Sequence, residues 1–409
     1  MLDTAISIPH IEQVGVRARD IYSQQPTRDF VRSLVISERR VRLLQYDRSG
    51  AKYSDPFDFH LEAARFVKLV LGLTSDDPRL VGFDKSICWE VYKGTKDVHG
   101  KINAVDAKGD KITYDIVGDR PSFHRCSLIG RATNTWDVTG PNGEEYIVKD
   151  LWREARRSSE PDLLEAAKGV VGVAQMIACE DIYKVSDFRD LQDGEELTDR
   201  TKCRITLERY GRQIEHFQSA SQALWALHDA ISAHKELFKA GVLHRDISKN
   251  NILFGRPDAE PGWRGVLIDM DMSIFVDLAK RDNAADFRTG TRMFQSISVL
   301  TSFNSKVPMA QDFYDDIESF FYVLCYLLFV CESKGKQYRI LPMPQERTLR
   351  VKIHWRHFRG VCIGLLGRAL QESSPGIPQY YPLPCQIEGK DTPQRPKGEV
   401  DRGPESRVA

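Results

Sequence analysis

The chain has 409 residues, more than a single hydrophobic core usually serves, so two lobes or domains are expected. Lysine and arginine together number 58, aspartate and glutamate also number 58, and no long run of one charge sign occurs. This balance argues against a protein that binds nucleic acid or an anionic membrane surface.

The eight cysteines are scattered, with no CxxC pair. A disulfide framework or a zinc site is therefore not expected, and the pattern fits a reducing cytoplasmic or nuclear setting. The first residues lack the basic segment and apolar core of a secretory signal, so none is expected. The longest wholly apolar run, residues 320–331, is too short to span a bilayer and suits a buried helix.

The first 120 residues mix helical and strand patterns. In chain order, the predicted elements are a helix over residues 6–22, a strand hairpin over 30–50 with the turn DRSG at 47–50, a helix over 58–73 that Gly72 ends, and strands over 89–94 and 101–119 around a turn at 107–110.

Two strands are then predicted around the turn PNG at residues 141–143, and the second ends in Lys149. Taken alone, Lys149 would be a solvated edge lysine, but its place after a turn at Gly130 favours a phosphate-binding role. In this turn Gly130, Ala132 and Thr135 stand where phosphate-binding loops of the GxGxxG type have three glycines. The two side chains narrow the backbone angles open to the loop.

A short helix is predicted after Lys149, with Ser159 as its N-cap and Gly169 at its end. Either Glu160 or Glu165 would pair with Lys149, and the apolar residues that follow favour Glu160. A solvated helix face is the alternative.

A long helix is predicted from Ser221 to Gly241, and it leads directly into the segment LHRDISKNNILF, residues 243–254. In that segment a His-Arg-Asp triplet is followed, five positions after its aspartate, by Asn251. An apolar strand then ends at Asp269. This order of residues matches the phosphoryl-transfer pattern of protein kinases.

The chemistry explains the spacing, since phosphoryl transfer needs a positioned hydroxyl and a neutralised phosphate. Asp246 would take the hydroxyl proton, and Asn251 and Asp269 carry the oxygen ligands that Mg²⁺ prefers beside nucleotide phosphates. Magnesium is therefore implied. A lone triplet would fit a buried histidine at a turn equally well, but here Asn251, Asp269 and the flanking strands accompany it.

Further short motifs occur in a fixed order along the chain. They are DRSG at Asp47, LIGRAT at Leu128, VKDLW at Val148, HRDISKNNIL at His244, LIDMDMS at Leu267, RTGTRMF at Arg288 and YDDIESFFYVL at Tyr314. Together they resemble the fungal-type protein kinases, a divergent branch of the protein-kinase fold, over roughly residues 30–330. The resemblance implies a two-lobed fold, ATP with Mg²⁺, and phosphorylation of serine or threonine hydroxyls of a protein substrate.

The resemblance also implies roles position by position. The catalytic triplet is His244, Arg245 and Asp246, with Asp246 as the base. The nucleotide-binding set is Lys149, Glu160, Gly130, Ala132, Asn251 and Asp269, of which Asn251 and Asp269 also hold the metal, and Asp316 braces the catalytic loop.

Three positions depart from the usual kinase pattern. Asp271 replaces the glycine of the DFG triplet, which removes backbone freedom and predicts a loop held in one state. The sequence SIS at residues 296–298 replaces APE. Ser248 takes the place of the lysine common in serine/threonine kinases, and Lys249 follows one position later.

Arg245 suggests a regulatory hypothesis, because its guanidinium is suited to bind a phosphate on the activation segment through charge-assisted hydrogen bonds. Ser273, Thr289 and Thr291 are the candidate phosphorylation sites.

The predicted fold class is α+β, with a small β-rich N-lobe and a larger, mostly helical C-lobe. The predicted domains are an N-terminal extension packed on the kinase lobe over residues 1–80, an N-lobe over 81–210, a C-lobe over 211–370 and a disordered tail over 371–409. The tail is predicted from its clustered proline and glycine and its few large apolar residues.

Three functions compete. An active protein kinase comes first, followed by a small-molecule kinase with the same machinery and by a pseudokinase that binds nucleotide or a partner without transfer. The RTGTRMF segment argues against the second, whereas the poor glycine loop and Asp271 favour the third. The sequence assigns no oligomeric state.

Overall fold

The computed structural model describes residues 8–91, 98–154, 159–189, 197–279, 290–302, 310–332 and 336–337. All of them belong to the first of two units, Met1–Arg359, whereas the second unit, Gly360–Ala409, lies outside the described residues. The tail predicted over residues 371–409 therefore lies outside them too.

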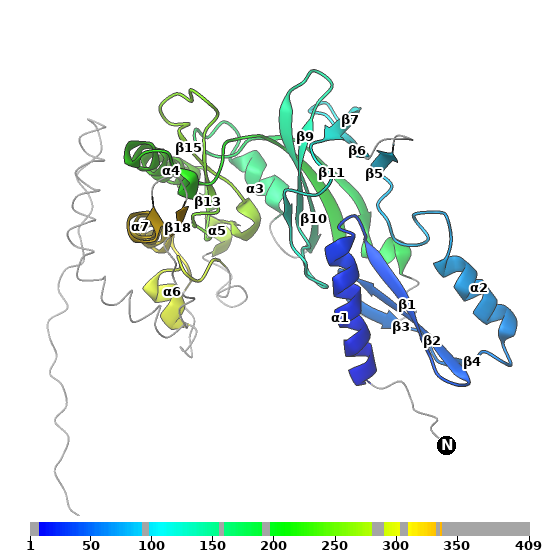
Figure 1. Cartoon of the computed structure of the whole chain (residues 1–409). Helices are drawn as coiled ribbons and strands as arrows, with labels where there is room; N and C mark the ends of the chain where they lie inside the picture. The colour runs from blue at the N-terminus through cyan, green and yellow to red at the C-terminus, as the bar shows by residue number, and fades with distance from the viewer. Residues whose placement is uncertain are drawn as a thin grey trace, which may run out of the picture. The chain divides into compact units, whose positions relative to one another are not determined.

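A helix and a small antiparallel sheet come first in the chain (Figure 1). Tyr22 of the helix packs with Val31, Leu44 and Tyr46 of the sheet, and all four side chains are buried. The predicted helix and the hairpin with its DRSG turn are confirmed. The elements are α1 (Ile8–Gln24), β1 (Phe30–Ile36), β2 (Arg40–Asp47), β3 (Gly50–Tyr53) and β4 (Phe57–Asp58), and β2 pairs with the other three strands.

The second helix, α2, is shorter than predicted. It spans Ala63–Leu73 rather than residues 58–73, because Asp58 belongs to β4. The Asp58 carboxylate accepts the amides of His60 and Leu61 at 2.9 and 3.3 Å, which holds a turn before the helix. The glycine that was expected to end the helix lies inside it.

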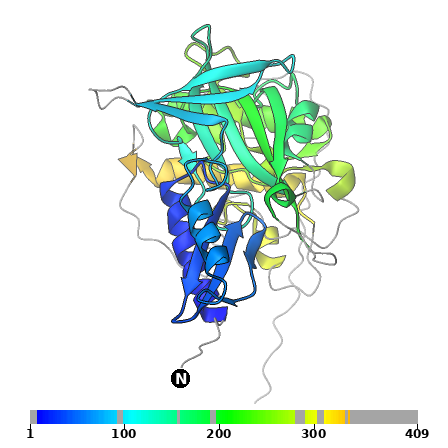
Figure 2. The ribbon, with the colours of Figure 1, turned by 90° about the vertical axis from the view of Figure 1, so that its right-hand side faces the viewer.

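Antiparallel strands form a larger sheet (Figure 2). Ile102, Tyr114, Trp136, Val138 and Val148 are buried together in one core cluster. The strands predicted around the turns at residues 107–110 and 141–143 are confirmed. The strands are β5 (Ile87–Val91), β6 (Val98–Val105), β7 (Lys111–Ile116), β8 (Phe123–His124), β9 (Asn134–Thr139), β10 (Glu145–Glu154), β11 (Met176–Lys184) and β12 (Arg200–Glu208), in the order β11-β12-β10-β9-β7-β6-β5 with β8 paired to β9.

Lys149 was predicted as the last residue of its strand, which is wrong. β10 continues from Lys149 to Glu154 and pairs with both β9 and β12. Val148 lies in the core cluster, so the alternation of side chains turns Lys149 to the opposite face of the sheet. Lys149 is therefore a buried residue in the middle of the strand.

Most helices follow later in the chain. Ser159 caps α3 as predicted, since its hydroxyl accepts the Asp162 amide. The next helix, α4, has Ser219 as its N-cap rather than Ser221, because Ser219 accepts the Gln222 amide at 3.1 Å. The helices are α3 (Glu160–Ala166), α4 (Ala220–Lys239), α5 (Val276–Ala279), α6 (Ile297–Ser302) and α7 (Phe313–Phe329), with single 3-10 turns at Val185–Phe188, Ile214–His216 and Met270–Met272.

Short strand pairs surround the His-Arg-Asp segment. The apolar run lies mostly in α7, where residues 320–323 are buried. Among the described residues, no helix is long and apolar enough to cross a membrane. The fold is α+β as predicted, with a β-rich first part and helices later. The remaining strands are β13 (Val242–Leu243) paired with β16 (Ile274–Phe275), β14 (Ile252–Phe254) paired with β15 (Gly265–Leu267), and β17 (Cys331–Glu332) paired with β18 (Lys336–Gln337).

Candidate functional site

The hairpin β14–β15 brings Asn251 and Asp269 to the same end of two paired strands. The main-chain oxygen of Asn251 accepts the Ile268 amide at 3.0 Å, and Asp269 is the next residue. The side-chain amide of Asn251 donates to the main-chain oxygen and to Oδ2 of Asp246, at 2.8 and 3.0 Å. Asn251 therefore holds the Asp246 carboxylate beside Asp269.

Lys149 joins this group from β10. Its Nζ lies 2.7 Å from Oε1 of Glu160 and 2.7 Å from Oδ1 of Asp269. Burial lowers the pKa of Lys149, but the charges of Asp269 and Glu160 outweigh burial and raise it above its usual value. Glu165, the other candidate partner, pairs instead with Lys168 on the exposed side of α3. Glu160 is thus the partner of Lys149.

Glu160 should make stability depend on pH. Burial raises its pKa to about 7, against the lowering effect of Lys149, whereas the unfolded chain releases this proton near about pH 4.3. The stability contributed by protonated Glu160 is therefore complete below about pH 4.3 and is lost as the pH rises through about 7. The raised pKa of Lys149 and the lowered pKa of Asp269 keep both groups charged across this window.

We expect Glu160→Gln, a mimic of the protonated carboxyl, to gain stability relative to the wild type between about pH 5 and about pH 8, by on the order of 2 kcal/mol. Urea unfolding of both proteins at the two pH values measures this difference. A difference that does not change with pH would contradict the raised pKa.

His244 binds main-chain atoms on both sides, whereas the main-chain amide of Arg245 binds the side chain of Asp316. His244 Nε2 lies 3.1 Å from the Ile268 oxygen, and Nδ1 accepts the Asp246 amide at 3.3 Å. Burial lowers the pKa of His244, which favours the neutral ring. The Arg245 amide donates to Oδ2 of the buried Asp316 at 3.0 Å, and Arg245 has a φ of +67°. Asp316 thus braces the loop at a strained residue, as predicted.

Two of the candidate phosphorylation sites are engaged inside the protein. The amide and hydroxyl of Thr291 both donate to Oδ1 of Asp246, at 2.8 and 3.0 Å. Ser273 is buried and donates to the main-chain oxygen of His244 at 3.1 Å. Thr289 lies outside the described residues, so its phosphorylation stays a prediction. Sequence reasoning missed the contact between Thr291 and Asp246.

Lys249 does not fill the position that Ser248 occupies. Its Nζ pairs with Glu215 at 2.7 Å and lies over the ring of Tyr326. Ser248 itself is fully buried. The lysine is therefore committed to a different ion pair.

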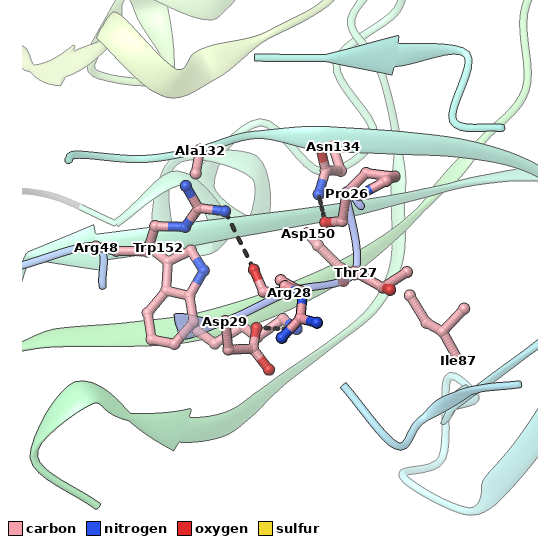
Figure 3. Close-up of a pocket in the computed structure, with 11 residues that line it drawn as sticks. Pro26, Thr27, Arg28, Asp29, Arg48, Ile87, Ala132, Asn134, Asp150 and Trp152 are labelled. Carbon is pink, nitrogen blue, oxygen red and sulfur yellow. Dashed lines mark hydrogen bonds and ion pairs between the residues drawn. The ribbon is translucent and has the colours of Figure 1, made fainter. Parts of the chain in front are cut away.

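The loop of Gly130 and Ala132 connects β8 to β9 and contacts the DRSG turn. Gly130 has a φ of +107°, and its amide donates to the main-chain oxygen of Arg48 at 3.0 Å. The buried Arg48 guanidinium in turn donates to the Ser127 oxygen at 2.7 Å; Figure 3 shows Arg48 among its neighbours. Ala132 adopts a φ of +45° despite its Cβ, and Thr135 lies in β9 opposite Lys149, outside the loop. The turn forms, but the Gly130 amide is already engaged.

Sequence reasoning also missed an ion pair between Arg131 and Asp271, whose Nη1 and Oδ2 atoms lie 2.6 Å apart. Asp271 places a charge at the position where the usual kinase pattern has the glycine of DFG, and Arg131 places one beside the glycine positions of the phosphate-binding loop. Two opposite charges at such positions were the available signal. Only the structure shows that they meet.

The residues that converge here fit a nucleotide with a metal ion. No group of three or more His, Cys, Asp or Glu side chains in the described ranges is arranged to hold a metal. However, Mg²⁺ bound with a nucleotide takes most of its ligands from phosphate and water, so the oxygens of Asn251 and Asp269 suffice. The buried ammonium of Lys149 suits the phosphate charge.

A model of the protein family described as fungal protein kinase matches residues 7–194 and 184–328. These two stretches contain every residue of the site described above. No curated protein matches the chain.

Proposed function

Since this chain belongs to the fungal protein kinase family, we propose that it transfers the γ-phosphate of ATP to serine or threonine hydroxyls of a protein substrate. One observation carries this proposal. Lys149 Nζ contacts both Glu160 and Asp269 at 2.7 Å, although these residues lie 11 and 120 positions away in the chain. A lysine held by a helix glutamate beside a metal-binding aspartate is what ATP-dependent transfer by kinases requires.

In this proposal Asp246 takes the proton of the substrate hydroxyl, because Asn251 and Thr291 hold its carboxylate in place. Asn251 and Asp269 hold Mg²⁺ through their side-chain oxygens, and Lys149 binds phosphate. When bound, Mg²⁺ neutralises phosphate charge. His244 and Arg245 act on the position of Asp246, since the His244 ring accepts the Asp246 amide and the Arg245 amide is bound to the buried Asp316.

We also propose the two-lobed organisation, with an N-lobe over residues 81–210 and a C-lobe over 211–370. The end of β12 at Glu208 and the start of α4 at Ala220 support a boundary between them. Residues 1–80 form an extension in this scheme. The proposed setting is the cytoplasm or nucleus.

A nucleotide-binding pseudokinase is the second candidate. Two contacts favour it: the Gly130 amide is bound to Arg48, and Asp271, in place of glycine, is bound to Arg131. Such a protein would bind ATP without transferring phosphate.

A labelling experiment distinguishes these candidates. The full chain is incubated with Mg²⁺ and ATP labelled in the γ-phosphate, together with a generic basic protein or a small amino alcohol. We expect label on the protein, released as phosphoserine or phosphothreonine by acid hydrolysis. Label on the amino alcohol alone would indicate a small-molecule kinase, and ATP binding without any transfer would indicate a pseudokinase.

A further inference from the structure

Arg131 and Asp271 link the β8–β9 loop to the segment that follows Asp269. Arg131 Nη1 lies 2.6 Å from Oδ2 of Asp271 and 3.5 Å from the sulfur of Met272. The two charged side chains are only 15% and 11% exposed, so solvent screens their interaction little. The pair is thus a sheltered contact, unlike a surface ion pair.

The main chain fixes Arg131 close to Lys149. The Arg131 oxygen accepts the amide of Trp152, which lies three positions after Lys149 in β10. Lys149 contacts Asp269, and Asp271 follows two residues later. These links close a ring, so the cations of Lys149 and Arg131 face one cluster of carboxylates. That cluster is where the proposed function places the phosphates and Mg²⁺.

In the β8–β9 loop a side chain, rather than a row of main-chain amides, is the group suited to bind phosphate. In kinases with three glycines, loop amides cover the phosphates, because glycine lets the backbone approach closely. Here the Gly130 amide already donates to the main-chain oxygen of Arg48, Ala132 carries a side chain, and Thr135 lies in β9, outside the loop. Arg131 brings a guanidinium to the same loop. One guanidinium can donate two parallel hydrogen bonds to phosphate oxygens.

We propose that Arg131 is a phosphate-binding residue of the nucleotide site, held by Asp271 when no nucleotide is present and transferred to the nucleotide phosphates when one binds. This inference rests on the proposed function. Asn251 and Asp269 would hold the Mg²⁺ that accompanies a nucleotide, and the charge of that ion would offset the removal of the Arg131 guanidinium from Asp271.

Removing Arg131 alone would not test this proposal. Arg131→Leu also leaves the Asp271 carboxylate without its partner, and that carboxylate would then repel the nucleotide phosphates. The informative comparison uses Asp271→Asn as the starting protein. In that background we expect Arg131→Leu to weaken binding of Mg-ATP by roughly ten- to a hundredfold, the loss of one or two charge-assisted hydrogen bonds. Binding of adenosine, which has no phosphate, should change less than about threefold.

Arg125→Leu in the same background is the matched control, since Arg125 is an exposed arginine of the same loop. It should change neither affinity. Titration calorimetry measures the dissociation constants, and circular dichroism shows that each variant is folded. Equal ATP affinity with and without Arg131 in the Asp271→Asn protein would overturn the proposal and leave the pair as a brace only. If the wild type bound no ATP, the proposed function itself would fail instead.

Discussion

Replacing Asp246 by asparagine should lower the rate of phosphate transfer by about a hundred- to ten-thousandfold, the contribution typical of a general base. The affinity for ATP should stay within a few-fold, because Lys149 contacts Glu160 and Asp269 and does not contact Asp246. Asparagine keeps the shape of aspartate and one oxygen acceptor, so the Thr291 contacts to Oδ1 have a substitute partner. The loss should therefore appear in the chemical step rather than in binding.

Single-turnover transfer and nucleotide titration, measured on the same preparation, separate the two effects. Glu165→Gln is the control. Glu165 lies on α3, as Glu160 does, but it pairs with Lys168 outside the site, so its replacement should change neither the transfer rate nor the ATP affinity. Transfer at the wild-type rate by the Asp246→Asn protein would mean that another group takes the proton. A parallel loss of ATP binding would mean that the substitution had disturbed the site.

Local spacing made most of the site predictable. Asn251 directly precedes β14, Asp246 lies shortly before Asn251, and Asp269 follows β15, so the pairing of these two neighbouring strands brings the three together. Glu160 was preferred over Glu165 because apolar residues follow it, and α3 indeed buries Glu160. In such cases a short-range pattern determines the contact.

Contacts between distant segments could not be predicted in this way. Arg131 and Asp271 are far apart in the chain, and although each is an unusual charge at its position, a single sequence does not show that the two pair with each other. The start of α4 was misplaced because two serines, Ser219 and Ser221, can each cap a helix, and only the bond to Gln222 decides between them. Lys149 was placed at a strand end because its pairing on both sides depends on strands distant in the sequence.

The packing of the N-terminal residues was predicted, but the contacts that attach them to the larger sheet were likewise hidden in the sequence. Lys202 of β12 is buried, and its Nζ lies 2.8 Å from Oδ1 of Asp29 and 2.5 Å from Oδ2 of Asp84. Tyr183 also donates to Asp29. Burial raises the pKa of Asp29 despite the opposing charge of Lys202. The charge of Lys202 is thus what offsets part of the cost of burying the Asp29 carboxylate.

Lys202→Met should therefore destabilise the fold by about 3–5 kcal/mol, the cost of leaving a buried charge without its partner. Asp84 keeps a second cation, Arg204, at 3.2 Å, so most of the cost should come from Asp29. Adding Asp29→Asn to Lys202→Met should then recover part of the loss, because the amide removes the unpaired charge. Chemical unfolding of the two single variants and the double variant gives the coupling energy.

Lys168→Met provides the control, since this lysine pairs with Glu165 on the surface, with side chains 69% and 61% exposed, and should cost less than about 1 kcal/mol. A Lys202→Met protein as stable as this control would show that residues near Asp29 are not held to β12 by charge. The Arg48 side chain donates to the main-chain oxygen of Arg28 at 3.2 Å, next to Asp29, and the Arg48 oxygen accepts the Gly130 amide. A change in the position of Asp29 should therefore also alter the β8–β9 loop. The same Lys202→Met protein should then bind ATP more weakly at temperatures below its unfolding transition, whereas Lys168→Met should not.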